Sequence, residues 1–143
     1  MLTEQQKTIE FARKLHGHVG PYLVIGLKMG SATKKALNIT DTESTRLRAE
    51  IAVPLYPPFS CLLDGIQVST TCTIGNQRLQ FKNSKTIQAT FIVENGGKIA
   101  KITLTKPFRE ILDEMTKQDK LNEAYAWEIS EQPGNQLFKI TLE

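Results

Sequence analysis

Residues Arg46–Val53 read RLRAEIAV, and their side chains alternate between polar and apolar. Because successive side chains of a strand point to opposite faces, this period of two predicts a half-buried β-strand. Pro54 and the pair Pro57-Pro58 end the strand, and Ser60 can then cap a helix that runs through Gln67 towards Thr71. A strand followed directly by a helix indicates that both element types contribute to the fold.

Five further segments show the composition and alternation of strands. The turn signal Asn95-Gly96-Gly97 separates two of them and predicts a hairpin. A second hairpin is expected in the tail, around Gln132-Pro133-Gly134-Asn135. Short turns of this kind favour antiparallel pairing. The expected strands are Leu79–Phe81, Thr86–Val93, Ala100–Leu104, Tyr125–Ile129 and Leu137–Leu142.

Helical spacing of apolar residues surrounds these strands. Gly17 and Pro21 separate the first two helices, because glycine destabilises a helix interior by about 1 kcal/mol and proline lacks an amide donor. The expected helices are Glu4–Leu15, Pro21–Leu37, the segment from Ser60 towards Thr71, and a segment that starts at Pro107. We therefore expect one α+β domain over residues 1–143, with a mixed, mostly antiparallel sheet packed against two to four helices.

Composition excludes several classes of protein. Hydrophobic residues make up 40% and charged residues 23% of the 143 residues, as in ordinary globular proteins. A net charge of +3 gives no concentrated basic surface for nucleic acid, and no apolar run is long enough to cross a membrane. The first residues lack the features of a signal peptide, so we expect a cytoplasmic protein with reduced cysteines.

Both histidines of the chain lie in one tripeptide, His16-Gly17-His18. In an extended or turn conformation, side chains two residues apart project to the same side, so the two imidazoles can converge. Histidine is the commonest metal ligand and titrates near neutral pH. The alternative is that one imidazole caps a backbone carbonyl and the other is exposed, which an isolated pair of this kind also permits.

Cys61 and Asp64 form a second candidate group. At the first turn of a helix, backbone amides lower the pKa of a thiol, which favours Cys61 as a metal ligand or nucleophile. Asp64 lies one turn on, where its carboxylate could orient a histidine or act as a general base, and Gln67 follows another turn later. The alternative is a buried structural cysteine beside a surface carboxylate.

Cys72 follows Cys61 by 11 residues, which corresponds to about 16 Å along a continuous helix. Both sulfurs can reach one ion only if the helix ends near Thr70-Thr71 and the chain doubles back. The spacing excludes a CxxC redox pair and a zinc finger.

The two segments together resemble the signature blocks of the FmdE family of formylmethanofuran dehydrogenase proteins. That family shows an HGHxCPG block followed by a C-x-x-D-x-I-Q-x-x-T-G-C-T-x-G block. Here the corresponding stretches are LHGHVGPYL at residues 15–23 and SCLLDGIQVSTTCTIG at residues 60–75. The resemblance covers about residues 8 to 82. It differs at Gly20, where the family has cysteine, and at Thr71, where it has glycine. The chain also lacks the C-terminal cysteine-rich zinc finger of many relatives.

The resemblance implies an α+β core with a cleft that holds one transition-metal ion, zinc. It carries the ligand role to His16, His18 and Cys61, and it places Asp64, Gln67 and Cys72 along the same cleft. The implied function is a metal-binding protein linked to C1, formylmethanofuran or redox metabolism, with an unidentified small-molecule ligand.

The sequence leaves open whether the chain is an enzyme, a non-catalytic accessory subunit or metal- or cofactor-binding module of a larger complex, or a structural domain without a site. The small residues Gly26, Gly30, Ser31 and Ala32 would allow close helix packing, from which we expect a homodimer or a subunit of a complex.

Overall fold

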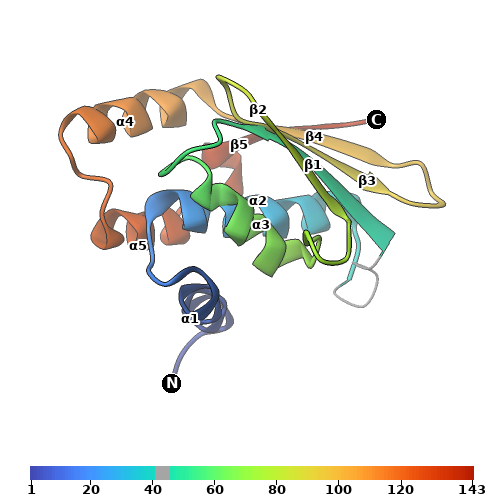
Figure 1. Ribbon diagram of the computed structural model, residues 1–143, viewed down its shortest axis with the longest axis horizontal. Helices are drawn as coiled ribbons and strands as arrows, with labels where there is room; N and C mark the ends of the chain where they lie inside the picture. The colour runs from blue at the N-terminus through green and yellow to red at the C-terminus, as the bar shows by residue number, and fades with distance from the viewer. Residues whose placement is uncertain (41–45) are drawn as a thin grey trace.

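The computed structural model describes residues 1–40 and 46–143. A five-stranded sheet with the order β2-β1-β3-β4-β5 lies on one side of the molecule (Figure 1). The strands are β1 (Leu47–Val53), β2 (Leu79–Asn83), β3 (Gln88–Val93), β4 (Ile99–Leu104) and β5 (Phe138–Leu142). All neighbouring strands are antiparallel except β1 and β2, which are parallel. The α+β class, with a mixed and mostly antiparallel sheet, is therefore confirmed.

The strand predicted at Arg46–Val53 is confirmed as β1. Its buried residues are Leu47, Ala49, Ile51 and Val53, and they alternate with more exposed ones, as the period of two requires. The predicted hairpin at Asn95-Gly96-Gly97 is confirmed as well, since Asn95 and Gly97 have positive φ and β3 pairs with β4.

Six helices accompany the sheet within the described residues, more than the two to four that the sequence predicts. Figure 1 shows α2 and α3 between the sheet and α1. The bounds of the helices are α1 (Glu4–His16), α2 (Pro21–Leu37), α3 (Cys61–Thr70), α4 (Lys106–Lys117), α5 (Glu123–Glu131) and α6 (Gly134–Leu137).

One reason for the difference is α5, because the sequence predicts a strand at Tyr125–Ile129 and this segment is helical. Asn122 caps the helix by accepting a hydrogen bond from the Tyr125 amide. Tyr125, Ala126 and Ile129 are buried, a spacing that places them on one helical face. The cap and this packing outweigh the strand tendency of the short aromatic segment. The predicted tail hairpin is therefore wrong, although β5 itself forms.

Helices α2 and α3 approach each other through glycines. A Cβ atom on Gly26 would lie 2.2 Å from the Leu62 carbonyl oxygen, and one on Gly65 would lie 2.2 Å from the Leu23 carbonyl oxygen. Such contacts exclude any side chain, so the two backbones touch. The small-residue face of α2 is thus used within the chain, and it no longer provides an argument for a homodimer.

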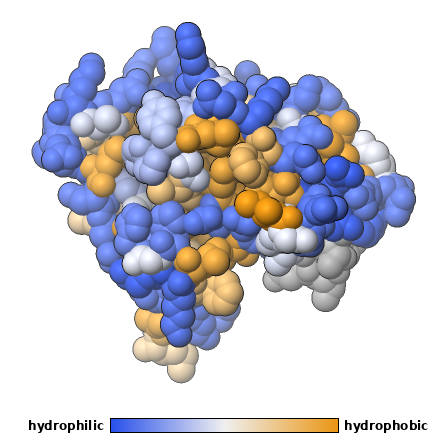
Figure 2. Space-filling model, in the orientation of Figure 1, coloured by the Kyte–Doolittle hydropathy of each residue, from blue (hydrophilic) through white to orange (hydrophobic). Residues whose placement is uncertain are grey.

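Helix α1 packs differently, because only Ile9 and Ala12 of this helix are buried. Phe11 and Leu15 are 65% and 57% exposed, and apolar surface is visible over α1 at the bottom of Figure 2. Polar contacts therefore contribute to its placement, among them a hydrogen bond from the Gln5 amide to the Ser130 carbonyl oxygen of α5. No helix within the described residues is long and apolar enough to cross a membrane.

Candidate functional site at the junction of α1, α2 and α3

The end of α1 positions the two histidines. His16 is the last residue of α1, and Gly17 ends the helix with φ 100° while its amide donates to the Arg13 carbonyl oxygen at 2.7 Å. After this turn, the ring centroids of His16 and His18 lie 4.6 Å apart with 37° between the ring planes. The chain thus brings the two imidazoles side by side, as the sequence predicts.

Asp64 reaches the same place from the first turn of α3. His16 Nδ1 lies 2.6 Å from Asp64 Oδ2, and the His16 side chain is 11% exposed. The other carboxylate oxygen, Oδ1, accepts a hydrogen bond from Gln67 Nε2 at 3.2 Å, and Gln67 Oε1 accepts from the Ile74 amide at 3.2 Å. Gln67 therefore fixes the carboxylate, and the carboxylate fixes the imidazole.

The second nitrogen of His16 has no such partner. Its Nε2 atom is buried and makes no hydrogen bond to any described residue. Because the carboxylate of Asp64 accepts a hydrogen bond, Nδ1 carries the proton and Nε2 keeps its lone pair. An oriented imidazole with a free lone pair can bind a metal ion, accept a proton or receive a hydrogen bond from a ligand.

Cys61 is the first residue of α3, but its environment differs from the expected one. Ser60 has helical backbone angles and makes no side-chain cap, so the predicted Ser60 cap is wrong. Burial raises the pKa of the Cys61 thiol, and the charge of Asp64 raises it further, whereas a backbone hydrogen bond opposes the shift. The expected lowering of this pKa is wrong as well, since desolvation and the carboxylate outweigh the helix amides.

Cys72 lies beyond the opposite end of α3 from Cys61. Thr71 ends the helix with φ 58°, and the buried Cys72 thiol then donates to the Leu47 carbonyl oxygen at 3.3 Å. Its sulfur is directed towards the start of β1, whereas Asp64 faces His16 from the first turn of α3. The helix does end where the sequence suggests, but the chain continues towards the sheet.

A metal ion implied by the family has only part of its ligand set in place. The unpartnered Nε2 of His16 and the adjacent ring of His18 fit such an ion. Within residues 1–40 and 46–143, however, no three side chains of the histidine, cysteine, aspartate or glutamate type are grouped so that they could hold it. The structure thus brings together His16, His18 and Asp64 without forming a closed coordination sphere.

A clasp between α1 and α5 was not predicted from the sequence. Arg13 donates to both carboxylate oxygens of Glu123, at 3.1 and 2.9 Å, and Trp127 Nε1 donates to Glu123 Oε2 at 3.1 Å. These bonds lower the pKa of Glu123 to about 2, with a smaller contribution from the nearby His18. The expected strand at Tyr125–Ile129 concealed the clasp, because only a helix places Glu123 and Trp127 on one face.

Comparisons with known proteins agree with this architecture. A crystal structure of an FmdE-like protein from Syntrophus aciditrophicus, assigned to a tungsten formylmethanofuran dehydrogenase, superposes with a TM-score of 0.65. The match covers 97% of this chain and 71% of that chain at 18% sequence identity, which shows a shared fold.

A curated relative from Archaeoglobus fulgidus, named as a probable S-adenosyl-L-methionine-binding protein, is 31% identical over 80 residues. The aligned segment covers 53% of this chain and 22% of the relative, so the chain spans about a fifth of that protein.

The family comparison covers most of the chain. Residues 15–141 match the model of the FmdE family, which is described as "Molybdenum formylmethanofuran dehydrogenase operon". The matched region contains the His16–His18 turn, α3 with Asp64, and all five strands. The chain belongs to the FmdE family.

Proposed function

We propose that the protein is a metal-binding FmdE protein in which His16 Nε2 is the central ligand of one zinc ion. The observation that carries the proposal is the buried Nε2 atom, which lacks a partner among the described residues while Nδ1 of the same ring is held by Asp64 at 2.6 Å. Metal-bound histidines commonly donate their other ring nitrogen to a carboxylate, which orients the ring and raises its basicity. Burying a polar nitrogen without a partner is costly, and a bound ion would remove that cost.

His18 and Cys61 are the further ligands in this proposal. The ring of His18 lies beside that of His16, and Cys61 lies in the same first turn of α3 as Asp64. Zinc favours nitrogen and thiolate ligands, and it binds the thiolate by displacing its proton. Gly20, which replaces the family cysteine, supplies no donor, so the set leaves a coordination position open to water or a small ligand.

An ion with an open position supplies Lewis-acid chemistry: it polarises a bound oxygen and lowers the pKa of bound water. The residues of the chain orient and hold protons around it. Gln67 fixes Asp64, and Asp64 keeps the proton of His16 on Nδ1. The link to formylmethanofuran or redox metabolism rests on the family description, in which the chain would act as an enzyme or as an accessory subunit.

The test is zinc content in protein purified without a histidine tag and dialysed against zinc. We expect about one ion per chain in the wild type, as in mononuclear zinc sites, and its loss in His16→Ala. Asp64→Asn should weaken zinc affinity by about 10-fold to 100-fold, because the ring loses its orienting partner. Cys72→Ala is the matched control for Cys61→Ser, since both remove a thiol but only Cys61 lies near Asp64.

Two results would contradict the proposal. One is a wild-type protein that binds no zinc under these conditions. The other is His16→Ala protein that is folded by circular dichroism and retains the ion. Equal zinc content in Cys61→Ser and Cys72→Ala would remove Cys61 from the ligand set.

A further inference from the structure

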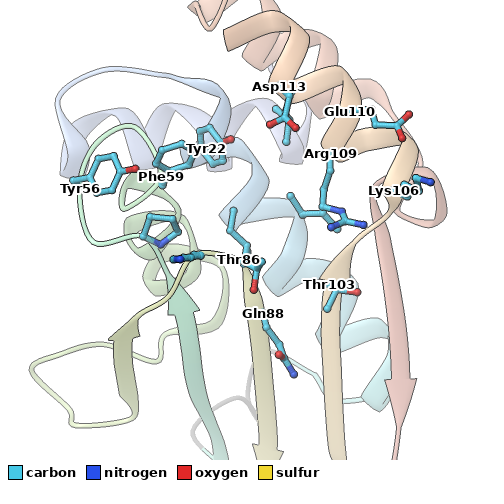
Figure 3. Close-up of a pocket in the computed structure, with 15 residues that line it drawn as sticks. Tyr22, Tyr56, Phe59, Thr86, Gln88, Thr103, Lys106, Arg109, Glu110 and Asp113 are labelled. Atoms are coloured by element: carbon cyan, nitrogen blue, oxygen red, sulfur yellow. The ribbon is translucent and has the colours of Figure 1, made fainter. Parts of the chain in front are cut away.

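A second cavity lies away from the histidine turn, between α4 and the loop that joins β1 to α3. Its volume is about 680 Å³, within the range of small-molecule sites. Figure 3 shows that its floor is formed by the ends of the central strands, with Gln88 and Thr103 directed towards it. None of the residues proposed to bind metal lines this cavity.

One wall of the cavity is aromatic. Phe59 lies between two tyrosines, with its ring centroid 5.1 Å from that of Tyr22 and 5.3 Å from that of Tyr56. Both pairs are edge-to-face, with interplanar angles of 67° and 83°. Tyr56 is 59% exposed, so its ring extends the wall towards solvent without belonging to the core. A planar ring is the ligand group that such a wall packs against most favourably.

The hydroxyl of Tyr22 is a polar group without a partner in this wall. Tyr22 is 4% exposed, and it hydrogen-bonds to none of the described residues. In Figure 3 its oxygen points away from Phe59 and towards Asp113 across the cavity. Burial, together with the charge of Asp113, raises the pKa of Tyr22, so the hydroxyl remains a donor at neutral pH. A donor left in this position is available to a ligand.

The opposite wall carries charge. Arg109 extends from α4 over the strand ends, and Lys106 precedes it by one helical turn (Figure 3). Lys85 contributes a third cation from the β2–β3 connection, and Glu110 and Asp113 are the two acidic residues of the lining. Within the described part of the chain, none of these three cations forms an ion pair. A guanidinium without a carboxylate partner is a ready site for a planar oxyanion, which it can bind with two parallel hydrogen bonds.

We propose that this cavity binds a small molecule with a planar ring and a terminal oxyanion, a carboxylate or a phosphate. The ring packs against Tyr22, Phe59 and Tyr56, and the oxyanion pairs with Arg109, with Lys106 and Lys85 adding positive charge. Tyr22 donates to a polar atom of the ring. The proposal does not depend on the metal, because the two sites share no residue.

The experiment is isothermal titration of the full chain with 2-naphthoate and 2-naphthyl phosphate, which distinguishes the two oxyanions. The neutral 2-naphthamide has the same ring and should bind about tenfold more weakly than the better anion, as expected for one lost charge-assisted contact. Saturable binding of either anion supports the proposal. Absence of saturable binding of both, or equal affinity for the amide, overturns it.

Two variants test the walls separately. Arg109→Glu should weaken binding of the anion at least about tenfold, whereas Lys117→Glu, on the same helix but outside the cavity, makes the same change of net charge and should leave binding unchanged. Tyr56→Ala should weaken binding of all three compounds by about threefold to tenfold, because it removes an aromatic contact that they share. Equal losses in the two charge variants would show a long-range effect of net charge and overturn the assignment to this cavity. Unchanged binding in Tyr56→Ala would overturn the assignment of the aromatic wall.

Discussion

Asp64 connects α3 to the end of α1 through a 2.6 Å contact between its Oδ2 atom and Nδ1 of His16. The same carboxylate raises the pKa of the neighbouring Cys61 thiol. One side chain thus orients an imidazole and keeps a thiol protonated. Both effects can be measured through the cysteine.

Removing the charge of Asp64 should make Cys61 more reactive. In Asp64→Asn the carboxylate no longer opposes ionisation, so the thiolate fraction at pH 8 rises and alkylation by iodoacetamide accelerates. Peptide mass spectrometry distinguishes Cys61 from the buried Cys72. Asp113→Asn, which changes charge at a distant carboxylate, serves as the control. A rate for Cys61 that is unchanged in Asp64→Asn would contradict this assignment.

The backbone contact between α2 and α3 predicts a large loss of stability in Gly65→Ala. The added methyl would lie 2.2 Å from the Leu23 carbonyl oxygen, so the helices must separate. Overpacking of this kind costs about 1–3 kcal/mol of the free energy of unfolding, measured by urea denaturation. Gly75→Ala is the control, because the nearest atom to its Cβ would be 3.9 Å away. Equal stability of the two variants would show that the helices can adjust freely.

The clasp between Arg13 and Glu123 predicts a pH-dependent contribution to stability. The pKa of Glu123 falls from 4.5 to about 2 in the folded protein, so the clasp stabilises fully above pH 4.5. This contribution declines as the pH falls towards 2, where the carboxylate is protonated in both states. The difference in Tm between the wild type and Glu123→Gln should therefore shrink between pH 4.5 and pH 2. A difference that stays constant over this range would exclude the ion pair as its cause.

Tyr125 predicts a gain of stability on removal of its hydroxyl. The oxygen is buried and has no hydrogen-bond partner among the described residues. Tyr125→Phe removes an unsatisfied polar atom and keeps the ring, so the free energy of unfolding should rise by about 1 kcal/mol. Tyr56→Phe, at an exposed position, should leave stability unchanged. A loss of stability in Tyr125→Phe would show that the hydroxyl has a partner, such as an ordered water.

The sequence predicted the elements whose pattern is local. The alternation of Arg46–Val53, the glycine turn after β3 and the break at Gly17 and Pro21 each depend on neighbouring residues, and the structure contains all three. The segment Tyr125–Ile129 has the composition of a strand, but its helical structure depends on the Asn122 cap and on packing against the body of the protein. The parallel pairing of β2 with β1 is likewise non-local.

The candidate site was predicted in part for the same reason. Spacing alone suggests that His16 and His18 converge, and their rings are indeed adjacent. The ionisation of Cys61 depends on burial and on the Asp64 charge, which no pattern of spacing reveals. The direction taken by Cys72 depends on where the chain goes after Thr71, towards Leu47 of β1. The roles of His18 and Cys61 as ligands stay predictions.

The parallel pairing of β1 and β2 has a consequence for how the protein folds. Parallel neighbours cannot be joined by a tight turn, so α3 must cross between them before they pair. Asp64 lies in that crossover, and its partner His16 lies 48 residues earlier in the chain. Contacts of such sequence separation form after local turns and helices, because the loop entropy must be lost first. The histidine–carboxylate pair is therefore a late product of folding, and a chain that has not completed its topology has no site to expose to stray metal ions.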